Sequence, residues 1–450
     1  MATSVYLCEL AWLPPGRVVA EVLIEIEDGV ITRVDPGAAP PAGTQRLCGL
    51  VLPGLANAHS HAFHRALRGR THAGHGTFWT WRDQMYGLAA RLGPERYLDL
   101  ARATFAEMAC AGFTSVGEFH YLHHGPGGAP YDDANEMGAA LIVAAREAGV
   151  RLALLDTCYL AGGIGRDLDP VQQRFSDGDA EGWVARVDDL ASRFGDDEDV
   201  VVGAALHSVR AVPRDQIPVV GAWAARHDVP LHAHVSEQPA ENEACVAAHG
   251  LTPVGLLGEC GVLGPRTTAV HATHLTDDDV AALGHTRTGV CLCPTTERDL
   301  ADGVGDAGAL LDAGSPLSLG TDSHALIDGF EEARAVELNL RVTTGKRGHL
   351  RTRTLLSAVT VDGHRALGFV RAGQLQVGGR ADLVAVDLRS ARTAGADAAS
   401  AAATVLYAAS PADITDVVIE GRRVVRDREH RLGDVGVLLR EAIAELEVER

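Results

Sequence analysis

The sequence lacks any apolar run long enough to cross a membrane, and it lacks a basic, apolar leader at its start. A spanning helix needs about 20 consecutive apolar residues, whereas the opening stretch MATSVYLCELAWLPPG is interrupted by Pro14 and Pro15. These two absences predict a cytoplasmic protein with no membrane partner. The eight cysteines contain no C-x-x-C pair, so neither a disulfide framework nor a zinc knuckle is expected.

Positive charge is scarce as well. The chain has 40 Lys and Arg against 60 Asp and Glu, which leaves a formal net charge of −20. A negative field of this kind repels phosphate backbones, and we therefore expect no nucleic acid partner. If the ligand is itself an anion, a few local arginines must overcome that field.

The 450 residues exceed what one hydrophobic core usually organises, which predicts a large domain with a smaller one attached. Short β patterns occupy both ends of the chain, and between them eight apolar strand candidates alternate with helical patterns or long loops. This alternation predicts an α/β fold, a (β/α)₈ TIM-like barrel over residues 53–371, with a small β-rich domain formed from residues 1–52 and 372–450. An open doubly wound sheet is the alternative, and the lack of a G-x-G-x-x-G motif after the first strand argues against its dinucleotide-binding form.

Two local patterns make sharper structural predictions. Between the first two strands, apolar residues recur at helical spacing, with Pro94 at the first helical position and Gly112 at C′, which predicts a helix over residues 94–111. The Ala-rich segment at residues 391–404, which also contains Thr, Ser and Gly, is predicted to be a loop of the small domain. The strand candidates end near His59, Glu118, Cys158, His207, His234, Ala272, Cys293 and Gly320.

Polar residues that can bind a metal are concentrated at these strand ends. His59 and His61 form an H-x-H, and because strand side chains alternate in direction, both imidazoles point to the same side and can share one ion. A pair of surface histidines is the alternative for an isolated H-x-H. Further candidates follow later strands: His232, His234, Glu237, His271, His274 and Asp322.

These candidates are expected to meet, because active sites of barrel enzymes lie at the C-terminal face of the strands. Three histidines and one carboxylate with an open position for water suit a catalytic divalent metal, most often Zn²⁺, with Fe²⁺ as the alternative. We therefore expect one divalent metal per chain. For any single histidine of the set, a satisfied core residue is the competing interpretation.

The segments PGLANAHSHAFHRALRG, HAHVSEQ, VHATH, SLGTDSH and GGRADLVAVD, taken in this order, resemble the deaminase branch of the amidohydrolase superfamily over nearly the whole chain. The resemblance implies a metal-dependent hydrolase barrel with a small β-sandwich domain. It implies a set of metal ligands, His59, His61, His234 and Asp322. It also implies three catalytic residues, Glu237, His271 and Asp322. His232 and His274 are then expected to be structural.

The segments TFWTWRDQMY, GEFHYLHH and ALHSVRAV are similar to those of formimidoylglutamate deiminases, which hydrolyse N-formimino-L-glutamate to N-formyl-L-glutamate and ammonia in histidine degradation. The resemblance implies that the substrate carboxylates are met by Arg82, Tyr121, His207 and Arg210. Arginine also meets the need for local cations, because its planar guanidinium binds a carboxylate bidentately. Where that family has a glutamine three residues after the second metal histidine, this chain has His64, which can likewise donate a hydrogen bond to substrate.

Three alternatives stay open. A guanidino analogue or another acyclic amidine could be the substrate. The second enzymatic hypothesis is a deaminase or chlorohydrolase of a purine, pyrimidine or triazine ring, although a ring favours stacking and amide partners over two arginines. The non-enzymatic hypothesis is a metal-free amidohydrolase-like binding or assembly protein, since a fold does not determine a function. The expected partner is a small acidic amidine, and the expected assembly is a homodimer.

Overall fold

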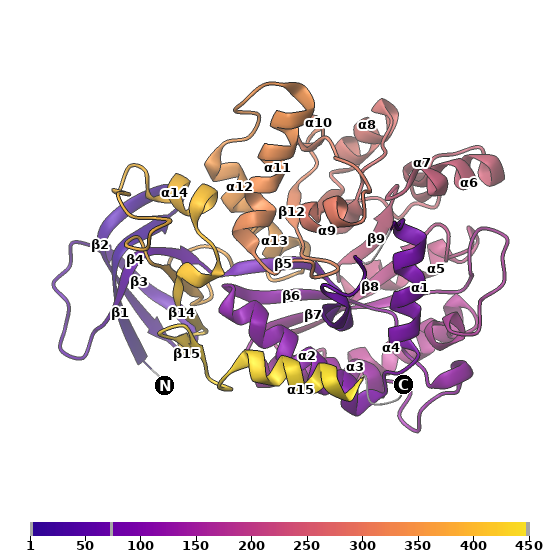
Figure 1. Ribbon diagram of the computed structural model, residues 1–450, viewed down its shortest axis with the longest axis horizontal. Helices are drawn as coiled ribbons and strands as arrows, with labels where there is room; N and C mark the ends of the chain where they lie inside the picture. Colours follow the sequence, from indigo (N-terminus) through magenta and orange to yellow (C-terminus); the bar gives the residue numbers. More distant parts are fainter. Residues whose placement is uncertain (1–2, 73–74, 447–450) are drawn as a thin grey trace.

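The computed structural model describes residues 3–72 and 75–446. Its strands form two separate eight-stranded sheets, one closed into a barrel and one forming the small domain (Figure 1). The barrel sheet runs in chain order, with every neighbouring pair parallel. The predicted TIM-like barrel is therefore confirmed. Its strands are β5 (Leu55–Ser60), β6 (Phe113–His120), β7 (Arg151–Cys158), β8 (Val200–Ser208), β9 (Leu231–Val235), β10 (Thr267–His271), β11 (Gly289–Leu292) and β12 (Leu317–Leu319).

Helices follow the strands and cover the outside of the barrel (Figure 1). Those of the first half are α1 (Phe78–Ala89), α2 (Pro94–Cys110), α3 (Glu136–Ala148), α4 (Ala180–Phe194), α5 (Ile217–His227), α6 (Pro239–His249) and α7 (Pro253–Glu259). Those of the second half are α8 (Asp277–Thr286), α9 (Pro294–Asp299), α10 (Ala307–Ala313), α11 (Gly329–Thr344), α12 (Thr352–Ala358) and α13 (Val361–Ala366). The short 3₁₀ helix η1 (Ala62–Leu67) follows β5 directly.

Helix α2 shows why the sequence pattern was sufficient for local prediction. Pro94 occupies the first helical position, where its missing N–H costs no hydrogen bond, and Gly112 has a φ of +87° just beyond the last turn. The helix ends at Cys110, one residue before the predicted end. The apolar positions Tyr97, Leu100 and Phe105 are buried, as the helical spacing predicts.

The barrel closes where its first strand meets its last. Ser60 and Asp322 form a parallel bridge, in which the Asp322 amide donates to the carbonyl of His59 over 3.0 Å. The Asn57 side chain reinforces the seam by accepting from the Thr321 amide and donating to its hydroxyl. Gly320 permits this approach, because a Cβ there would lie 2.7 Å from the Cβ of His59. Closure of the barrel thus brings Asp322 beside the H-x-H.

The small domain is built from both ends of the chain, as predicted. Its sheet has the order β16-β15-β14-β13-β4-β1-β2-β3, and the antiparallel pairing of β4 with β13 joins the two ends. The N-terminal strands are β1 (Thr3–Leu13), β2 (Arg17–Glu27), β3 (Val30–Pro36) and β4 (Gln45–Pro53). The C-terminal strands are β13 (Leu383–Val386), β14 (Ile414–Ile419), β15 (Arg422–Arg426) and β16 (Glu429–His430).

Two C-terminal helices, α14 (Ala401–Ala408) and α15 (Val435–Glu445), pack against helices of the barrel. The loop prediction for residues 391–404 is wrong at its end, because α14 begins inside that range and packs on α11. Alanine has the highest helix propensity, and Ala401 and Val405 of this short helix are buried. The last helix, α15, packs against α2, so the chain returns from the small domain to the outside of the barrel (Figure 1). The exact domain boundaries stay a prediction.

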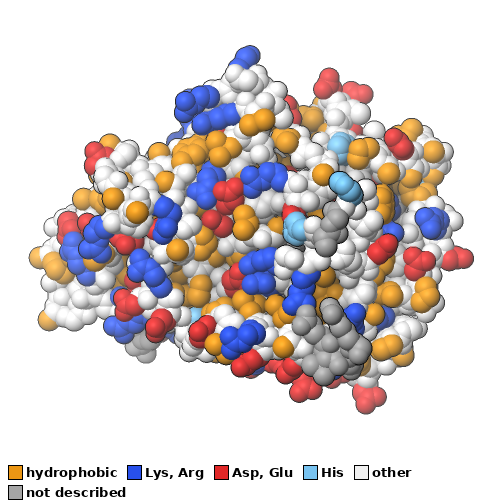
Figure 2. Space-filling model, in the orientation of Figure 1, with side chains coloured by type: hydrophobic (Ala, Val, Ile, Leu, Met, Phe, Trp, Pro, Cys, Tyr) orange, Lys and Arg blue, Asp and Glu red, His pale blue; other side chains and the backbone are white. Residues whose placement is uncertain are grey.

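The surface carries both signs of charge. Figure 2 shows acidic and basic side chains interspersed over one face of the molecule, with small apolar patches between them. Within the described residues, no helix is both long and apolar enough to cross a bilayer.

Candidate active site

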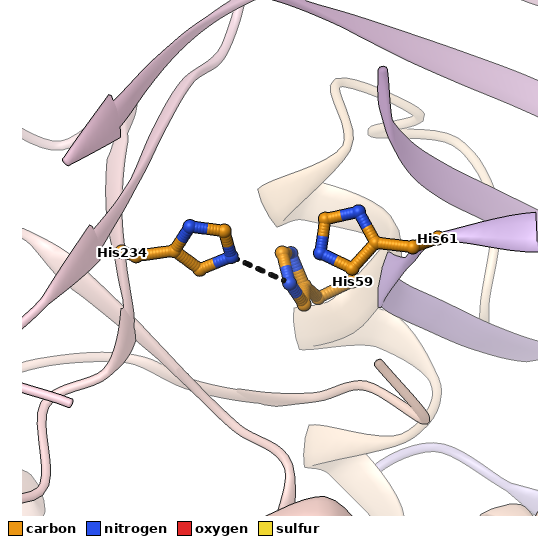
Figure 3. A group of neighbouring side chains, drawn as sticks. All are labelled: His59, His61 and His234. Carbon is orange, nitrogen blue, oxygen red and sulfur yellow. Dashed lines mark hydrogen bonds between the residues drawn. The ribbon is translucent and has the colours of Figure 1, made fainter. Parts of the chain in front are cut away.

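The four predicted metal ligands converge at the C-terminal end of the barrel. The Nε2 atoms of His59 and His234 lie 3.1 Å apart, although they come from β5 and β9 (Figure 3). Asp322 Oδ1 lies 3.3 Å from Nε2 of both His59 and His61. All four residues are buried, with at most 6% of their surface exposed.

Hydrogen bonds to Nδ1 determine whether the Nε2 atoms of these histidines carry a proton or a lone pair. Nδ1 of His61 lies 3.0 Å from the carbonyl of Phe119, and Nδ1 of His234 lies 2.9 Å from the carbonyl of His207. A carbonyl only accepts, so each Nδ1 carries the proton and each Nε2 presents a lone pair toward its neighbours. Lone pairs and a carboxylate facing one another in a buried site repel unless a cation lies between them. The donor set therefore fits a divalent metal.

The electrostatics agree with this assignment. Burial, together with neighbouring His59, lowers the pKa of His61 to about 3, so the imidazole is neutral and able to act as a ligand. Burial alone would raise the pKa of Asp322, but its histidine neighbours outweigh that effect and hold the pKa below its usual range. Neutral imidazoles and an ionised carboxylate are the protonation states that metal binding requires.

The two other catalytic candidates lie beside the ligands. His271 Nε2 is 3.7 Å from Glu237 Oε1 and 3.9 Å from Asp322 Oδ2. The opposite ring nitrogen of His271 lies 3.4 Å from Glu297 Oε1, and that oxygen also accepts from the Cys293 amide. Burial opposes charge on His271, but Glu237 and Glu297 overcome it and raise its pKa well above the usual value. Sequence reasoning missed Glu297, whose only signal was its place after the seventh barrel strand.

Strained backbone is concentrated in the same place. His271, Asp322 and Ser236 have φ values of +68°, +43° and +52°, which residues other than glycine rarely adopt. Such conformations cost free energy, of the order of 1 kcal/mol or more each, and persist where the surroundings impose them. Here they turn the chain sharply at the strand ends, where functional side chains are directed into one pocket.

That pocket has two connected parts. The inner chamber, a cavity of about 50 Å³, contains metal-ligand candidates, both Glu237 and His271, and all five predicted substrate-binding residues. These five are His64, Arg82, Tyr121, His207 and Arg210. The outer chamber, about 400 Å³, shares Arg82, His207 and Arg210 with the inner one and is bordered by α1, α6 and the loop after β7. The two arginines therefore line both chambers, beside the metal-ligand candidates in the inner one.

His64 is positioned by η1 next to the ligands. Its Nε2 lies 3.1 Å from the hydroxyl of Tyr121, and its ring centroid lies 4.5 Å from that of His61. Nδ1 of His64 is buried and has no hydrogen-bond partner in the described part of the chain. The side chain therefore retains one polar atom for a bound molecule.

The two arginines are held loosely. Arg82 lies over the rings of Trp79 and Tyr86, 4.6 and 5.4 Å from their centroids, and has no ion-pair partner among residues 3–72 and 75–446. Arg210 lies 3.5 Å from Glu237 and 3.7 Å from Glu241, longer than good charge-assisted hydrogen bonds. Nε of each arginine is buried without a hydrogen bond. Both guanidinium groups thus have donors to offer an anionic ligand.

The remaining histidines of the sequence motifs have structural partners. His232 Nε2 donates to the carbonyl of Ala366 over 2.9 Å, and His274 Nε2 donates to that of Asp302 over 2.7 Å. These contacts support the structural roles expected for them. Trp79 is 37% exposed and borders the outer chamber, whereas Trp81 borders the inner one.

Comparison with known proteins places this geometry in a family. The amidohydrolase family model matches residues 50–424, which include the H-x-H, the other ligands and both arginines. The chain belongs to the amidohydrolase family. It is 37% identical over 439 residues to the formimidoylglutamate deiminase of Pseudomonas aeruginosa, with 95% of this chain and 96% of that protein covered.

Solved amidohydrolase structures share the whole architecture. An amidohydrolase from Brucella melitensis superposes with a TM-score of 0.92 at 31% identity, covering 99% of this chain and 100% of that one. A zinc-bound adenosine deaminase from Xanthomonas campestris gives a TM-score of 0.85 at 27% identity, covering 98% and 97% of the two chains. The predicted resemblance and the predicted combination of barrel and small β domain are both confirmed.

Proposed function

We propose that this amidohydrolase is a formimidoylglutamate deiminase, which hydrolyses N-formimino-L-glutamate to N-formyl-L-glutamate and ammonia. The observation that carries the proposal is the presence of Arg82 and Arg210 in the wall of the same small chamber as the metal-ligand candidates. A neutral ring substrate offers no anion to two half-buried cations, whereas a dicarboxylate offers one to each. The relative that is 37% identical over nearly the full length supports the same substrate.

One divalent metal per chain, Zn²⁺ in our proposal, would be held by His59, His61, His234 and Asp322. The zinc-bound structural neighbour supports this choice, and neutral imidazoles with a carboxylate are common ligands of catalytic zinc. Such a metal supplies Lewis acidity, which lowers the pKa of water from 15.7 toward about 7 and makes a nucleophile available at neutral pH.

In our proposal, Asp322, His271 and Glu237 each have a separate role in the reaction. Asp322 Oδ2 accepts a proton from the attacking water, and the water oxygen forms a bond to the formimino carbon. His271, charged and held by Glu297, stabilises the negative charge that develops in the tetrahedral centre. Glu237 delivers a proton to the imino nitrogen as the water oxygen adds, and it regains one from the hydroxyl of the tetrahedral centre. The proton taken by Asp322 passes to the same nitrogen, so that the carbon–nitrogen bond breaks, ammonia leaves and the formyl carbonyl forms. No covalent enzyme intermediate is required.

Substrate orientation follows from the arginines and their neighbours. Arg82 and Arg210 bind the two carboxylates, and Tyr121, His207 and His64 add hydrogen bonds close to the reacting carbon. Because His64 Nδ1 has no partner within the described residues, it can donate to the substrate while its Nε2 accepts from Tyr121. The histidine thereby fulfils the positioning role of the glutamine that it replaces.

The deciding experiment measures ammonia release from N-formimino-L-glutamate, its neutral diamide and guanine, with wild type, Arg82→Ala and Arg210→Ala. We expect a strong preference for the acidic amidine. Each truncation should reduce kcat/KM for it by a factor that corresponds to about 2 to 4 kcal/mol, because a substrate carboxylate loses its charged partner. The diamide should respond much less to either substitution.

Metal content provides the control for these variants. Both arginine variants should keep the wild-type metal content, because neither side chain is a ligand. Preference for guanine, or equal turnover of the acid and the diamide, would instead favour the ring-deaminase hypothesis. A protein that carries metal and hydrolyses none of the three compounds would contradict both.

A further inference from the structure

Glu241 is a buried carboxylate that the proposed reaction does not use. It stands in the first turn of α6, has 1% of its surface exposed, and borders the outer chamber. Its Oε2 lies 3.7 Å from Nε of Arg210 and accepts a hydrogen bond of 3.3 Å from the Glu237 amide. Its other oxygen is buried and has no partner within the described residues.

Glu241 shares its nearest cation with a second carboxylate. Glu241 and Glu237 both approach Arg210, which is the nearest cation to either carboxylate. Bound substrate would add a third carboxylate to this single guanidinium. Three buried anions around one cation are electrostatically unfavourable unless one of them becomes neutral.

Glu241 is the group best placed to become neutral. Burial raises the pKa of Glu237 as well, but His271 and Arg210 both oppose that effect. Asp322 also faces His271, whereas the ion-pair partner of Glu241 among the described residues is Arg210. Burial raises the pKa of Glu241 to about 7, with Arg210 opposing and Glu237 adding to the effect. A proton on Glu241 could reside on Oε1, while Oε2 keeps its bond to the Glu237 amide.

We propose that Glu241 binds a proton when an acidic ligand binds to Arg210. The substrate carboxylate then replaces Glu241 as the ionic partner of the arginine. The inference rests on the proposed function only in taking Arg210 as a carboxylate-binding residue. Glu241 is thus a positioning residue. In the free enzyme the ionised Glu241 is an ion-pair partner of Arg210. In the complex Glu241 is protonated and neutral.

Other ionisable groups near Glu241 do not offer the same exchange. On α6 itself, Cys245 is the buried neighbour, and its pKa is raised to about 11 by burial and by Glu241, so the thiol stays neutral. The loop after β8 contributes Arg210 and His207, and burial and Arg210 lower the pKa of His207 well below its usual value. Across the outer chamber, α1 contributes Arg82 and Asp83, and the loop after β7 contributes Arg166 and Tyr159.

The sign of the pH dependence follows from these relations. Below about pH 7 Glu241 already carries its proton, and an acidic ligand binds without further proton uptake. Above that pH the ligand must bind together with a proton. Its affinity should therefore fall by about tenfold for each pH unit above neutrality until the pKa of Glu241 in the complex is reached. A capping role at the start of α6 would give no such dependence.

The test is calorimetry of glutarate binding to the zinc-loaded protein in buffers of different ionisation enthalpy, at pH 6 and pH 8. Glutarate is a dicarboxylate without an amidine, so the outcome is independent of catalysis. We expect wild type to take up close to one proton at pH 8 and almost none at pH 6. Glu241→Gln should take up about one proton fewer at pH 8, because the amide keeps the bond to the Glu237 backbone but cannot be protonated.

Glu243→Gln is the matched control, since Glu243 is exposed on the same helix and should leave proton uptake at the wild-type value. Equal uptake by wild type and Glu241→Gln, or no uptake by wild type, would overturn the inference. So would an absence of glutarate binding. If Glu241→Gln does not fold, a pH-independent dissociation constant in wild type would still refute it. Turnover of N-formimino-L-glutamate tests the proposed function separately from all of these results.

Discussion

Two buried groups of histidines and an aspartate lie at strand ends of the same barrel, and only one is suited to a metal. The first contains His59, His61, His234 and Asp322. The second, which we call the His120 cluster, contains His120, His123 and Asp156, whose potential ligand atoms lie within 4.8 Å of one another. Every member of the His120 cluster is 0 to 1% exposed, so neither burial nor residue type distinguishes the two groups.

The difference lies in what the carboxylate already binds. Asp156 accepts two hydrogen bonds of 2.8 Å from Arg186 and a third from the Trp183 indole. Arg186 places a fixed positive charge beside the cluster, and burial together with that charge lowers the pKa of His123 to about 4. Among the described residues, the ion-pair partners of Asp322 are all imidazoles, those of His59, His61 and His271. We therefore propose that Arg186, which already neutralises the Asp156 carboxylate, makes the second group less suited to a metal than the first.

The largest expected effect on activity comes from removing a ligand of the first group. Asp322→Ala or His59→Ala should remove the metal and reduce turnover to the background rate, because each change deletes a ligand of a single mononuclear site. Metal analysis and ammonia release on the purified variants check both quantities. A variant that kept full metal and wild-type turnover would refute the ligand assignment.

The next effect separates chemistry from metal binding. Glu237→Gln should keep the metal and reduce kcat by about 10²- to 10⁴-fold, since it removes proton delivery but no ligand. His271→Asn should act in the same direction. Single-turnover kinetics on the metal-loaded variants would measure the loss, and unchanged kcat in Glu237→Gln would exclude it as the proton donor.

Breaking the second group should affect stability instead. Asp156→Ala leaves the Arg186 charge buried with Asp177 as its carboxylate partner and the Asn135 side-chain oxygen as a further acceptor. We expect a loss of about 3 to 5 kcal/mol in the free energy of unfolding. Metal content of the folded fraction should not change. Denaturant unfolding gives the first quantity, and Asp196→Ala, at an exposed carboxylate that follows α4, is the control.

The smallest expected effect comes from substituting the same residue type in each of the two groups. His123→Gln should leave the metal-to-protein ratio unchanged, because the His120 cluster binds no ion in our interpretation. The same substitution at His61 should reduce that ratio markedly. Loss of metal from the His123 variant would show that the cluster is a second site after all.

The sequence was sufficient to predict the barrel, a helix over residues 94–111 that ends at Cys110 in the structure, and the convergence of the candidate ligands. Each follows from short-range patterns and their order along the chain. Alternating strand side chains brought His59 and His61 to one side, and chain order brought each strand end to one rim. The small domain followed from the β patterns at both ends of the chain.

Contacts between distant segments could not be predicted in the same way. Nothing near Asp156 indicates that it is paired with Arg186, and nothing near Glu241 indicates that Arg210 lies 3.7 Å away. The spacing of Glu237 and Glu241, four residues apart at the start of a helix, was a usable but ambiguous signal. The start of α14 at Ala401 was missed because the Thr, Ser and Gly of residues 391–404 indicate a loop, and the packing on α11 is not visible in the local sequence.

The seam between β5 and β12 also determines when the site comes into existence. Asn57 and Thr321 are 264 positions apart in the chain, and Asp322 joins His59 only when these segments meet. During synthesis, the H-x-H therefore leaves the ribosome long before its carboxylate partner does. Contacts of such long range form late and slowly in folding. A chain released before this point would have histidines but no complete ligand set, so catalytic competence arrives only with the closing segment of the barrel.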